Sequence, residues 1–158
     1  MPPSRMPSVP PDSDLPRPRQ VRATIELEIP SDVRYIERVV ELVTRHCQDL
    51  HYAPRLCALN VRVALTEALS NAILRGNNEE PDKHVYVRAE VTSQQLVLEV
   101  VDEGSGFDIC KCLVDPTRPE NLFREEGRGL FLMSKLMDRV ERYTDHGNVV
   151  RMTLNSHD

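Results

Sequence analysis

The sequence lacks the features that mark membrane proteins and general nucleic-acid-binding proteins. No apolar run approaches the roughly 20 residues that cross a bilayer, and the N-terminal residues contain no hydrophobic segment like that of a signal peptide. The net charge is −5 and no basic run dominates, whereas a nucleic-acid surface needs clustered cations to neutralise phosphates. We therefore expect a cytoplasmic protein that binds neither a membrane nor nucleic acid.

The chain also lacks the residue spacing of a metal centre built from cysteine and histidine. Cys47 and Cys57 fall in segments predicted to be helical, where small buried apolar residues are common. Cys110 and Cys112 form a single C-x-C, with no second pair and no nearby His at zinc spacing. The four cysteines are thus expected to be structural thiols.

Proline is unevenly distributed, and this predicts the domain organisation. Seven of the 12 prolines lie in residues 1–19, among Ser, Asp and Arg. Such a segment buries too little apolar surface to order itself, so a disordered Pro-rich tail is expected over 1–19. Pro16–Arg19 also has the composition of a docking peptide, although a solvated tail is the simpler interpretation. One folded domain is expected over 20–158, long enough to bury roughly two-thirds of its unfolded surface.

Hydrophobic periodicity predicts an α/β fold. Alternation at period two indicates strands, and apolar stripes at helical spacing indicate helices, with Ser31 as the expected N-cap of the first helix and Pro54 in the first turn of the second. The expected order is a strand over 21–29, helices over 32–49 and 54–76, strands over 84–91 and 95–102, a charged loop over 108–126, a helix over 127–137, and strands over 138–144 and 148–154. This order predicts a two-layer sandwich with helices on one face of a mainly antiparallel sheet.

Glu67 and Asn71 are the first candidate functional residues. They are four residues apart on a predicted helix, so their side chains lie on one face, one turn apart. The Asn71 amide oxygen suits Mg²⁺, which takes one or two protein oxygens in addition to phosphate oxygens. The Glu67 carboxylate suits a group that orients or deprotonates an attacking hydroxyl. Alone, the pair is more typical of an ordinary polar helix edge.

Asp102 ends an apolar strand and is followed by a glycine turn containing Gly104 and Gly106. An ionised carboxylate only accepts hydrogen bonds, so it suits the exocyclic amino group of adenine, which is a donor. The two glycines permit a sharp turn and a close approach of the backbone to a flat base. Alone, an Asp-Gly turn that ends a strand is common without any ligand.

Gly127, Arg128 and Gly129 directly precede the apolar run of the third predicted helix. A glycine-rich entry to a helix leaves backbone N–H groups free at the positive end of the helix dipole, which favours phosphate binding. Arg128 is a candidate phosphate contact, although a solvated surface arginine is the commoner case. Alone, the glycines are also compatible with a flexible junction.

In combination, the three motifs stand in the order, and on the elements, that a nucleotide pocket needs. They resemble the N box and the two glycine boxes of the GHKL ATP-binding superfamily, which includes gyrase, Hsp90, histidine kinases and MutL. The resemblance covers roughly 30–155 and implies a Bergerat-type fold with a mainly antiparallel mixed sheet. The run Gly127–Asp138 and the stretch Glu67–Ile73 are most similar to the single-domain serine kinases that act as bacterial anti-sigma factors.

The resemblance implies roles for the matching residues. Glu67 would activate the acceptor hydroxyl, Asn71 would hold Mg²⁺ on the phosphates of ATP, and Asp102 would bind adenine. The glycines would shape the pocket: Gly104 and Gly106 around the base, Gly127 and Gly129 along the phosphates beneath a lid formed by 108–126. Arg75 stands four residues after Asn71, where many of these kinases have His.

Three functions follow as hypotheses. The first is an ATP-dependent protein serine/threonine kinase that phosphorylates a small STAS-type antagonist, with sequestration of a sigma factor as a further role and a homodimer as the expected assembly. The second is a nucleotide-gated binding module without significant catalysis, in which ATP changes the affinity for a partner. The third is a detached catalytic domain of a histidine kinase, which the lack of room for a dimerisation helix pair before Glu67 disfavours.

Overall fold

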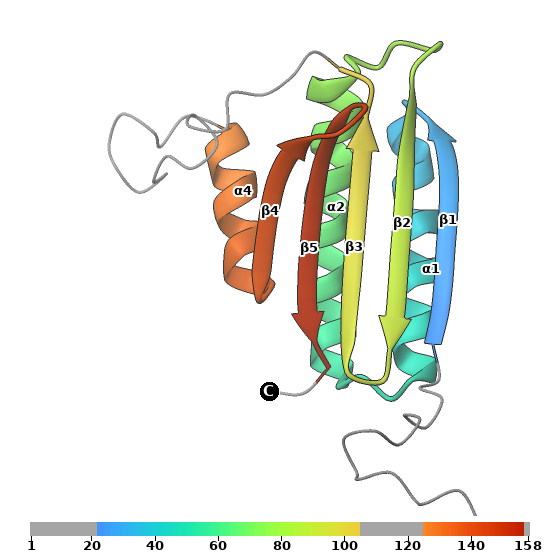
Figure 1. Cartoon of the computed structure of the whole chain (residues 1–158), viewed down its shortest axis with the longest axis vertical. Helices are drawn as coiled ribbons and strands as arrows, with labels where there is room; N and C mark the ends of the chain where they lie inside the picture. The colour runs from blue at the N-terminus through green and yellow to red at the C-terminus, as the bar shows by residue number, and fades with distance from the viewer. Residues whose placement is uncertain (1–21, 105–124, 157–158) are drawn as a thin grey trace, which may run out of the picture.

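The part of the chain that the computed structural model describes, residues 22–104 and 125–156, has two layers (Figure 1). One layer is a five-stranded sheet and the other consists of helices on one of its faces. The elements in chain order are β1 (Arg22–Pro30), the 3₁₀ turn η2 (Val33–Tyr35), α1 (Ile36–Asp49), the π-helical η3 (Leu56–Val61), α2 (Arg62–Asn71), the π-helical η4 (Ala72–Gly76), β2 (His84–Thr92), β3 (Gln95–Asp102), α4 (Glu125–Leu136), β4 (Arg139–Thr144) and β5 (Asn148–Asn155).

The sheet has the order β1-β2-β3-β5-β4, and each of its four pairings is antiparallel. The predicted two-layer α/β fold is therefore confirmed, with an antiparallel rather than a mixed sheet among the described strands. β5 inserts between β3 and β4, so the last strand of the chain lies beside β3. This insertion brings Asn148, the first residue of β5, opposite Asp102, the last residue of β3.

The inner face of the sheet follows from alternation along the strands. Leu96, Leu98 and Val100 of β3 are buried, and the side chains between them are only partly covered. Because side chains alternate between the two faces of a strand, Asp102 falls in phase with the apolar residues and is buried on the helical side. The alternation that builds the core thus places a carboxyl group at its edge.

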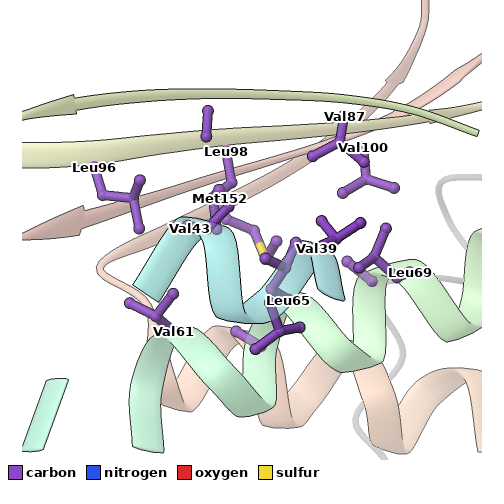
Figure 2. Packing of buried hydrophobic residues seen from close by; sticks show 14 of the residues in the cluster. Val39, Val43, Val61, Leu65, Leu69, Val87, Leu96, Leu98, Val100 and Met152 are labelled. Carbon is purple, nitrogen blue, oxygen red and sulfur yellow. The ribbon is translucent and has the colours of Figure 1, made fainter. Parts of the chain in front are cut away.

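Branched and straight aliphatic side chains from both layers fill the core (Figure 2). The helices contribute a stripe at helical spacing, and the strands contribute their inner faces. The fully buried residues include Val40 and Val43 of α1, Leu65 and Leu69 of α2, Ile73 of η4, Leu96 and Leu98 of β3, Met133 of α4 and Met152 of β5. Cys47 and Cys57 are free and buried in this core, as expected of small apolar residues on these helices, and burial raises the pKa of Cys47 to about 12.

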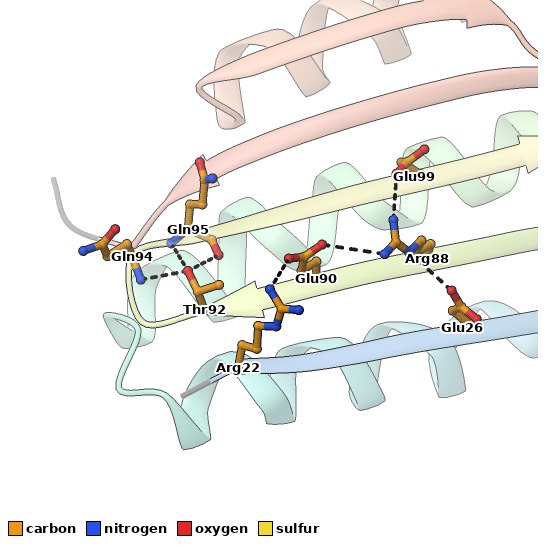
Figure 3. A network of polar contacts seen from close by, with 8 residues as sticks. All are labelled: Arg22, Glu26, Arg88, Glu90, Thr92, Gln94, Gln95 and Glu99. Carbon is orange, nitrogen blue, oxygen red and sulfur yellow. Dashed lines mark hydrogen bonds and ion pairs between the residues drawn. The ribbon is translucent and has the colours of Figure 1, made fainter. Parts of the chain in front are cut away.

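The outer face of the sheet carries a row of alternating charges across all five strands. Cross-strand register aligns Glu26, Arg88, Glu99, Arg151 and Glu141. Arg88 lies 3.4 Å from Glu26 and 3.8 Å from Glu99 (Figure 3). Because these groups are exposed or partly exposed to solvent, each pair contributes little to stability, on the order of 0–1 kcal/mol, and the row mainly keeps this face polar.

Two local predictions are corrected. Ser31 is not a helix cap: Asp32 caps the 3₁₀ turn η2 by accepting from the Arg34 amide, and the N-cap of α1 is Tyr35, which makes no side-chain cap hydrogen bond. Ser31 is buried and donates to the Lys83 carbonyl at 2.6 Å. The third helix begins at Glu125, two residues before Gly127, so the glycine motif lies within its first turns.

No helix in the described ranges is long and apolar enough to cross a membrane. The predicted tail over 1–19, Gly106, Cys110, Cys112 and most of the predicted lid lie outside these ranges.

Candidate active site

A cavity of about 310 Å³ opens between the helical segment formed by α2 and η4 and the helix α4. Its walls combine acidic, basic, amide and apolar groups from residues far apart in the chain. The lining residues are Glu67, Ser70 and Asn71 of α2, Leu74 and Arg75 of η4, and Gly129 and Leu132 of α4. Two of the three predicted motifs therefore meet at one place.

Helical periodicity explains why Glu67 and Asn71 face this cavity. Ala64, Leu65 and Ala68 belong to the stripe of α2 that is buried in the core. Glu67 and Asn71 lie beside this stripe, one turn apart, and are half-buried where α4 packs against α2. The fold thus holds a carboxylate and an amide side by side at the mouth of a cavity.

Gly129 of α4 lets the two helices approach at this point. A methyl group on Gly129 would lie 3.1 Å from Glu67 Oε2 and 3.2 Å from Asn71 Nδ2, closer than most such contacts in proteins. The sequence prediction gave Gly129 a role in phosphate binding through a free backbone N–H. The structure adds a packing reason for glycine here, because any larger residue would displace the two polar side chains.

Asp102, the last residue of β3, lies next to Gly76. Gly76 is the last residue of the helical segment formed by α2 and η4, and Glu67 lies about two turns earlier in the same segment. Its Oδ1 accepts two hydrogen bonds, from the Gly104 amide at 2.9 Å and from Asn148 Nδ2 at 2.8 Å. A Cβ on Gly76 would overlap the Cγ and both oxygens of the Asp102 carboxyl group, so only glycine fits beside it. Both described hydrogen bonds thus fix one oxygen and set the plane of the carboxyl group.

The electrostatics of Asp102 show a balance of opposing effects. Burial raises the pKa of Asp102 above its ordinary value. The hydrogen bonds from Asn148 and Gly104, together with the positive charges of Arg142 and Lys83, partly offset this rise. A buried carboxyl group with an imposed orientation costs stability and is typical of functional positions.

Two further residues hold the chain around Asp102. Asn77, which is fully buried, donates to Ser31 Oγ and to the His84 carbonyl, both at 2.9 Å, and accepts from the Glu103 amide at 2.8 Å. Gly147, in the turn between β4 and β5, has φ +144° and packs against the Asp102 carbonyl. Contacts from Asn77, after the end of η4, and from Gly147, in the β4–β5 turn, therefore hold the backbone at Asp102 and Glu103 in place.

The two ends of the site are separate. Asp102 does not line the described cavity, and Gly104 packs on the carbonyl of Gly76. Glu67 and Gly76 are nine residues apart on one continuous helical segment, so about two turns or more of helix separate them. Of the other predicted site residues, Gly127 and Arg128 lie in the first turn of α4, where only the backbone is described.

Comparison with known proteins is consistent with this arrangement. The family model of the histidine kinase-like ATPase domain matches residues 29–154, most of the chain. The chain belongs to this family. The predicted resemblance to GHKL ATPases is therefore confirmed, and membership implies ATP as the nucleotide.

Within the ATPase family, the chain is similar to three curated relatives that are named as serine-protein kinases or as an anti-sigma factor. The serine-protein kinase RsbW of Bacillus velezensis is 30% identical over 134 residues, which is 82% of this chain and 83% of the relative. RsbW of Bacillus subtilis is 28% identical over 134 residues, with the same two shares. The anti-sigma F factor of Clostridium beijerinckii is 28% identical over 98 residues, 60% of this chain and 67% of the relative.

Sequence reasoning missed part of the site of this ATPase-family domain. It gave no functional role to Gly76, Asn77 or Asn148. In the structure, Gly76 and Asn148 contact Asp102, and Asn77 accepts from the amide of the next residue, Glu103. The strand order was the missing information: once β5 is known to pair with β3, the register places Asn148 beside Asp102.

Proposed function

We propose that the protein is an ATP-dependent protein serine/threonine kinase of the anti-sigma-factor type, which phosphorylates a STAS-type antagonist and also sequesters a sigma factor. The observation that carries the proposal is the packing of Glu67 and Asn71 over Gly129 at one cavity of a histidine kinase-like ATPase domain. The names of the relatives, serine-protein kinase RsbW and anti-sigma F factor, support the kinase activity and a sigma factor as a partner.

The reaction is a phosphoryl transfer in which this chain acts chiefly by positioning. The acceptor Ser or Thr oxygen attacks the γ-phosphorus of ATP, and a new O–P bond forms as the bond to the β–γ bridging oxygen breaks. ADP leaves with the electron pair of that bond. The hydroxyl proton passes to the carboxylate of Glu67, which acts as general base. Asp102 accepts from the exocyclic amino group of adenine and fixes the opposite end of the nucleotide.

The residues at the cavity fit a magnesium ion held mainly by phosphate oxygens. Such an ion needs one or two protein oxygens and keeps several waters. Asn71 offers a neutral amide oxygen beside the carboxylate of Glu67, and both border the cavity. Asn71 would hold the ion, which supplies positive charge to the phosphates when bound.

A second candidate function is a nucleotide-gated binding module without significant catalysis. The observation that favours it is the apolar rim of the cavity, where Leu74 is 41% exposed and Leu132 is 38% exposed. A partner that covers this rim would sense whether nucleotide occupies the cavity. Any ligand that binds one state better shifts the equilibrium toward it, so catalysis is not required.

Phosphoryl transfer with a matched pair of variants separates the two functions. The full chain is mixed with γ-labelled Mg·ATP and a purified STAS-type antagonist, in parallel with Glu67→Gln and with Glu41→Gln, an exposed glutamate of α1. We expect acid-stable label on the antagonist with the unaltered chain and with Glu41→Gln, and none with Glu67→Gln, although this variant still binds ATP. Equal transfer by all three proteins would refute the role of Glu67. Nucleotide-dependent partner binding without transfer would favour the binding module.

The cellular context is part of the same proposal. We expect the protein to act in the cytoplasm and to form a homodimer. Light scattering coupled to size-exclusion chromatography tests the assembly: a mass of twice 18.1 kDa supports a dimer, and a mass of 18.1 kDa refutes it.

A further inference from the structure

The outer face of the sheet has no role in the reaction derived above. In the part of the chain that the structure describes, the helices lie on the opposite face (Figure 1), and the cavity with Glu67 and Asn71 lies among them. Two hollows of about 380 and 410 Å³ lie on the outer face, the first over β1, β2 and β3 and the second over β3, β5 and β4. One face of an antiparallel sheet is commonly left to water, so the pattern of its side chains must decide whether it also binds a partner.

Cross-strand register arranges the outer side chains in rows across β2, β3, β5 and β4. Residues that pair directly on neighbouring strands share a face, so each row follows from the pairings. Taken in the strand order β2, β3, β5, β4, three rows are Glu90, Val97, Thr153 and Arg139; Arg88, Glu99, Arg151 and Glu141; and Tyr86, Val101, Val149 and Tyr143. Two rows thus begin and end with opposite charges, and the third begins and ends with tyrosine.

Each row is complementary to its own reverse, as a two-fold symmetric contact between two copies of one chain requires. A two-fold axis that runs along the strands, between β3 and β5, places β2 of one copy over β4 of the other and β3 over β5. Opposite charges then face each other at three positions: Glu90 and the partner's Arg139, Arg88 and the partner's Glu141, and Glu99 and the partner's Arg151. In the third row, Tyr86 faces the partner's Tyr143 and Val101 faces the partner's Val149.

Other positions of the axis lose this complementarity. An axis along β3 places Glu99 over its own copy and Arg88 over the partner's Arg151, so like charges meet. An axis between β2 and β3 places Glu28 over the partner's Val149 and leaves β4, with Arg139, outside the contact. The pattern therefore favours the axis between β3 and β5.

The exposure of these side chains indicates what a second copy would add. The side chains of Arg139 and Arg88 are 70% and 49% exposed, and Tyr86 is 39% exposed. Within one copy, water screens the ion pairs and leaves the tyrosine uncovered (Figure 3). A second sheet packed on this face excludes that water, which strengthens each complementary pair and buries the band of tyrosine and valine.

We propose that two copies of this chain associate through the outer faces of their sheets, around a two-fold axis between β3 and β5. The inference rests on the homodimer expected under the proposed function and adds the surface at which the two subunits meet. The cavity of each copy lies on the helical side, so this contact leaves the proposed kinase site open.

Sedimentation velocity of the full chain over a concentration series measures the dissociation constant of the dimer. Arg88→Glu and Glu141→Arg each place like charges at both symmetry-related contacts, and we expect each to raise this constant at least roughly tenfold. An equimolar mixture of the two variants should recover the dimer, because both contacts in the mixed pair again join opposite charges. Arg38→Glu, an exposed charge reversal on α1, should dimerise as the unaltered chain does.

The remaining outcomes overturn the inference in different ways. Unchanged dissociation constants for both single variants would show that the copies do not meet at this face. A mixture that stays monomeric would show that the variants damage the sheet and share no contact, and loss of the dimer in Arg38→Glu alone would place the contact on the helical layer. Calorimetric ATP binding reports that each variant is folded. A monomeric unaltered chain would refute the homodimer and its surface together, whereas Glu67-dependent transfer by that monomer would leave the proposed kinase standing.

Discussion

Replacing Asp102 with asparagine removes the charge at the base end while it preserves the shape of the side chain. Asp102 Oδ1 accepts from the Gly104 amide and from Asn148 Nδ2. In Asp102→Asn the amide oxygen takes over both hydrogen bonds, so the amide nitrogen takes the place of Oδ2. The variant therefore presents a donor where the account needs an acceptor for the amino group of adenine.

The loss of ATP affinity follows from this exchange of acceptor for donor. A hydrogen bond to a charged group contributes about 1.5–3 kcal/mol, which corresponds to roughly a 10- to 150-fold weaker dissociation constant. We expect a loss in this range for ATP and an equal loss for adenosine, because the contact is to the base. Isothermal titration calorimetry measures both values.

The same substitution changes stability in the opposite direction. Burial raises the pKa of Asp102 in the folded protein above its ordinary value of 3.8. The folded state therefore binds this proton more tightly than the unfolded state, and the contribution of Asp102 to stability falls as pH rises from 3.8 through the raised value. Asparagine does not ionise, so the free energy of unfolding of Asp102→Asn should increase relative to the unaltered chain over this pH window and remain higher at neutral pH. Urea denaturation at several pH values measures the difference.

A matched control separates this effect from a general loss of a carboxylate. Asp138 accepts from the Asn155 amide at 2.6 Å and does not line the cavity, so Asp138→Asn should bind ATP as the unaltered chain does. Unchanged ATP affinity in Asp102→Asn would refute the placement of the base at Asp102. A lower free energy of unfolding at neutral pH would refute the cost assigned to the buried charge.

Two further substitutions distinguish the catalytic role of the site from its structural role. Gly129→Ala places a methyl group 3.1 Å from Glu67 and 3.2 Å from Asn71. We expect at least a roughly tenfold lower transfer rate, because the reacting groups are displaced. The free energy of unfolding should change by less than about 1 kcal/mol, since alanine favours the helix. An unchanged rate in a quench-flow assay would contradict this. Asn77→Ala removes the hydrogen bonds to Ser31 Oγ, the His84 carbonyl and the Glu103 amide and should lower the free energy of unfolding by about 2–4 kcal/mol; a loss under 1 kcal/mol in urea denaturation would show that water or relaxation replaces this network.

The fold was largely predictable because each element carries a local signal. The apolar run before Asp102 predicted β3 at Gln95–Asp102 with its observed bounds, and Pro54 marked the start of the second helix. The pairing of Glu67 and Asn71 could also be predicted from the sequence, because a spacing of four on a helix places both side chains on one face without any tertiary information. Local patterns therefore sufficed wherever the function depends on a single element.

The remaining features depend on contacts between elements, which no local pattern encodes. Asn148 reaches Asp102 only because β5 pairs with β3, and strand order does not follow from periodicity. Ser31 has the sequence context of a helix cap, but a tertiary hydrogen bond to Lys83 outweighs that preference. The approach of Gly129 to Glu67 depends likewise on how α4 packs against α2.

A structure of the full chain bound to Mg²⁺ and a non-hydrolysable ATP analogue tests the central claim most directly. The account predicts the amino group of adenine at hydrogen-bond distance from Asp102, the metal on the amide oxygen of Asn71, and the γ-phosphate at the end of the cavity bordered by Glu67. Because Gly104 packs on the carbonyl of Gly76, the turn after Asp102 should move to admit the base. A nucleotide bound away from Asp102, or with its γ-phosphate remote from Glu67, would contradict the account.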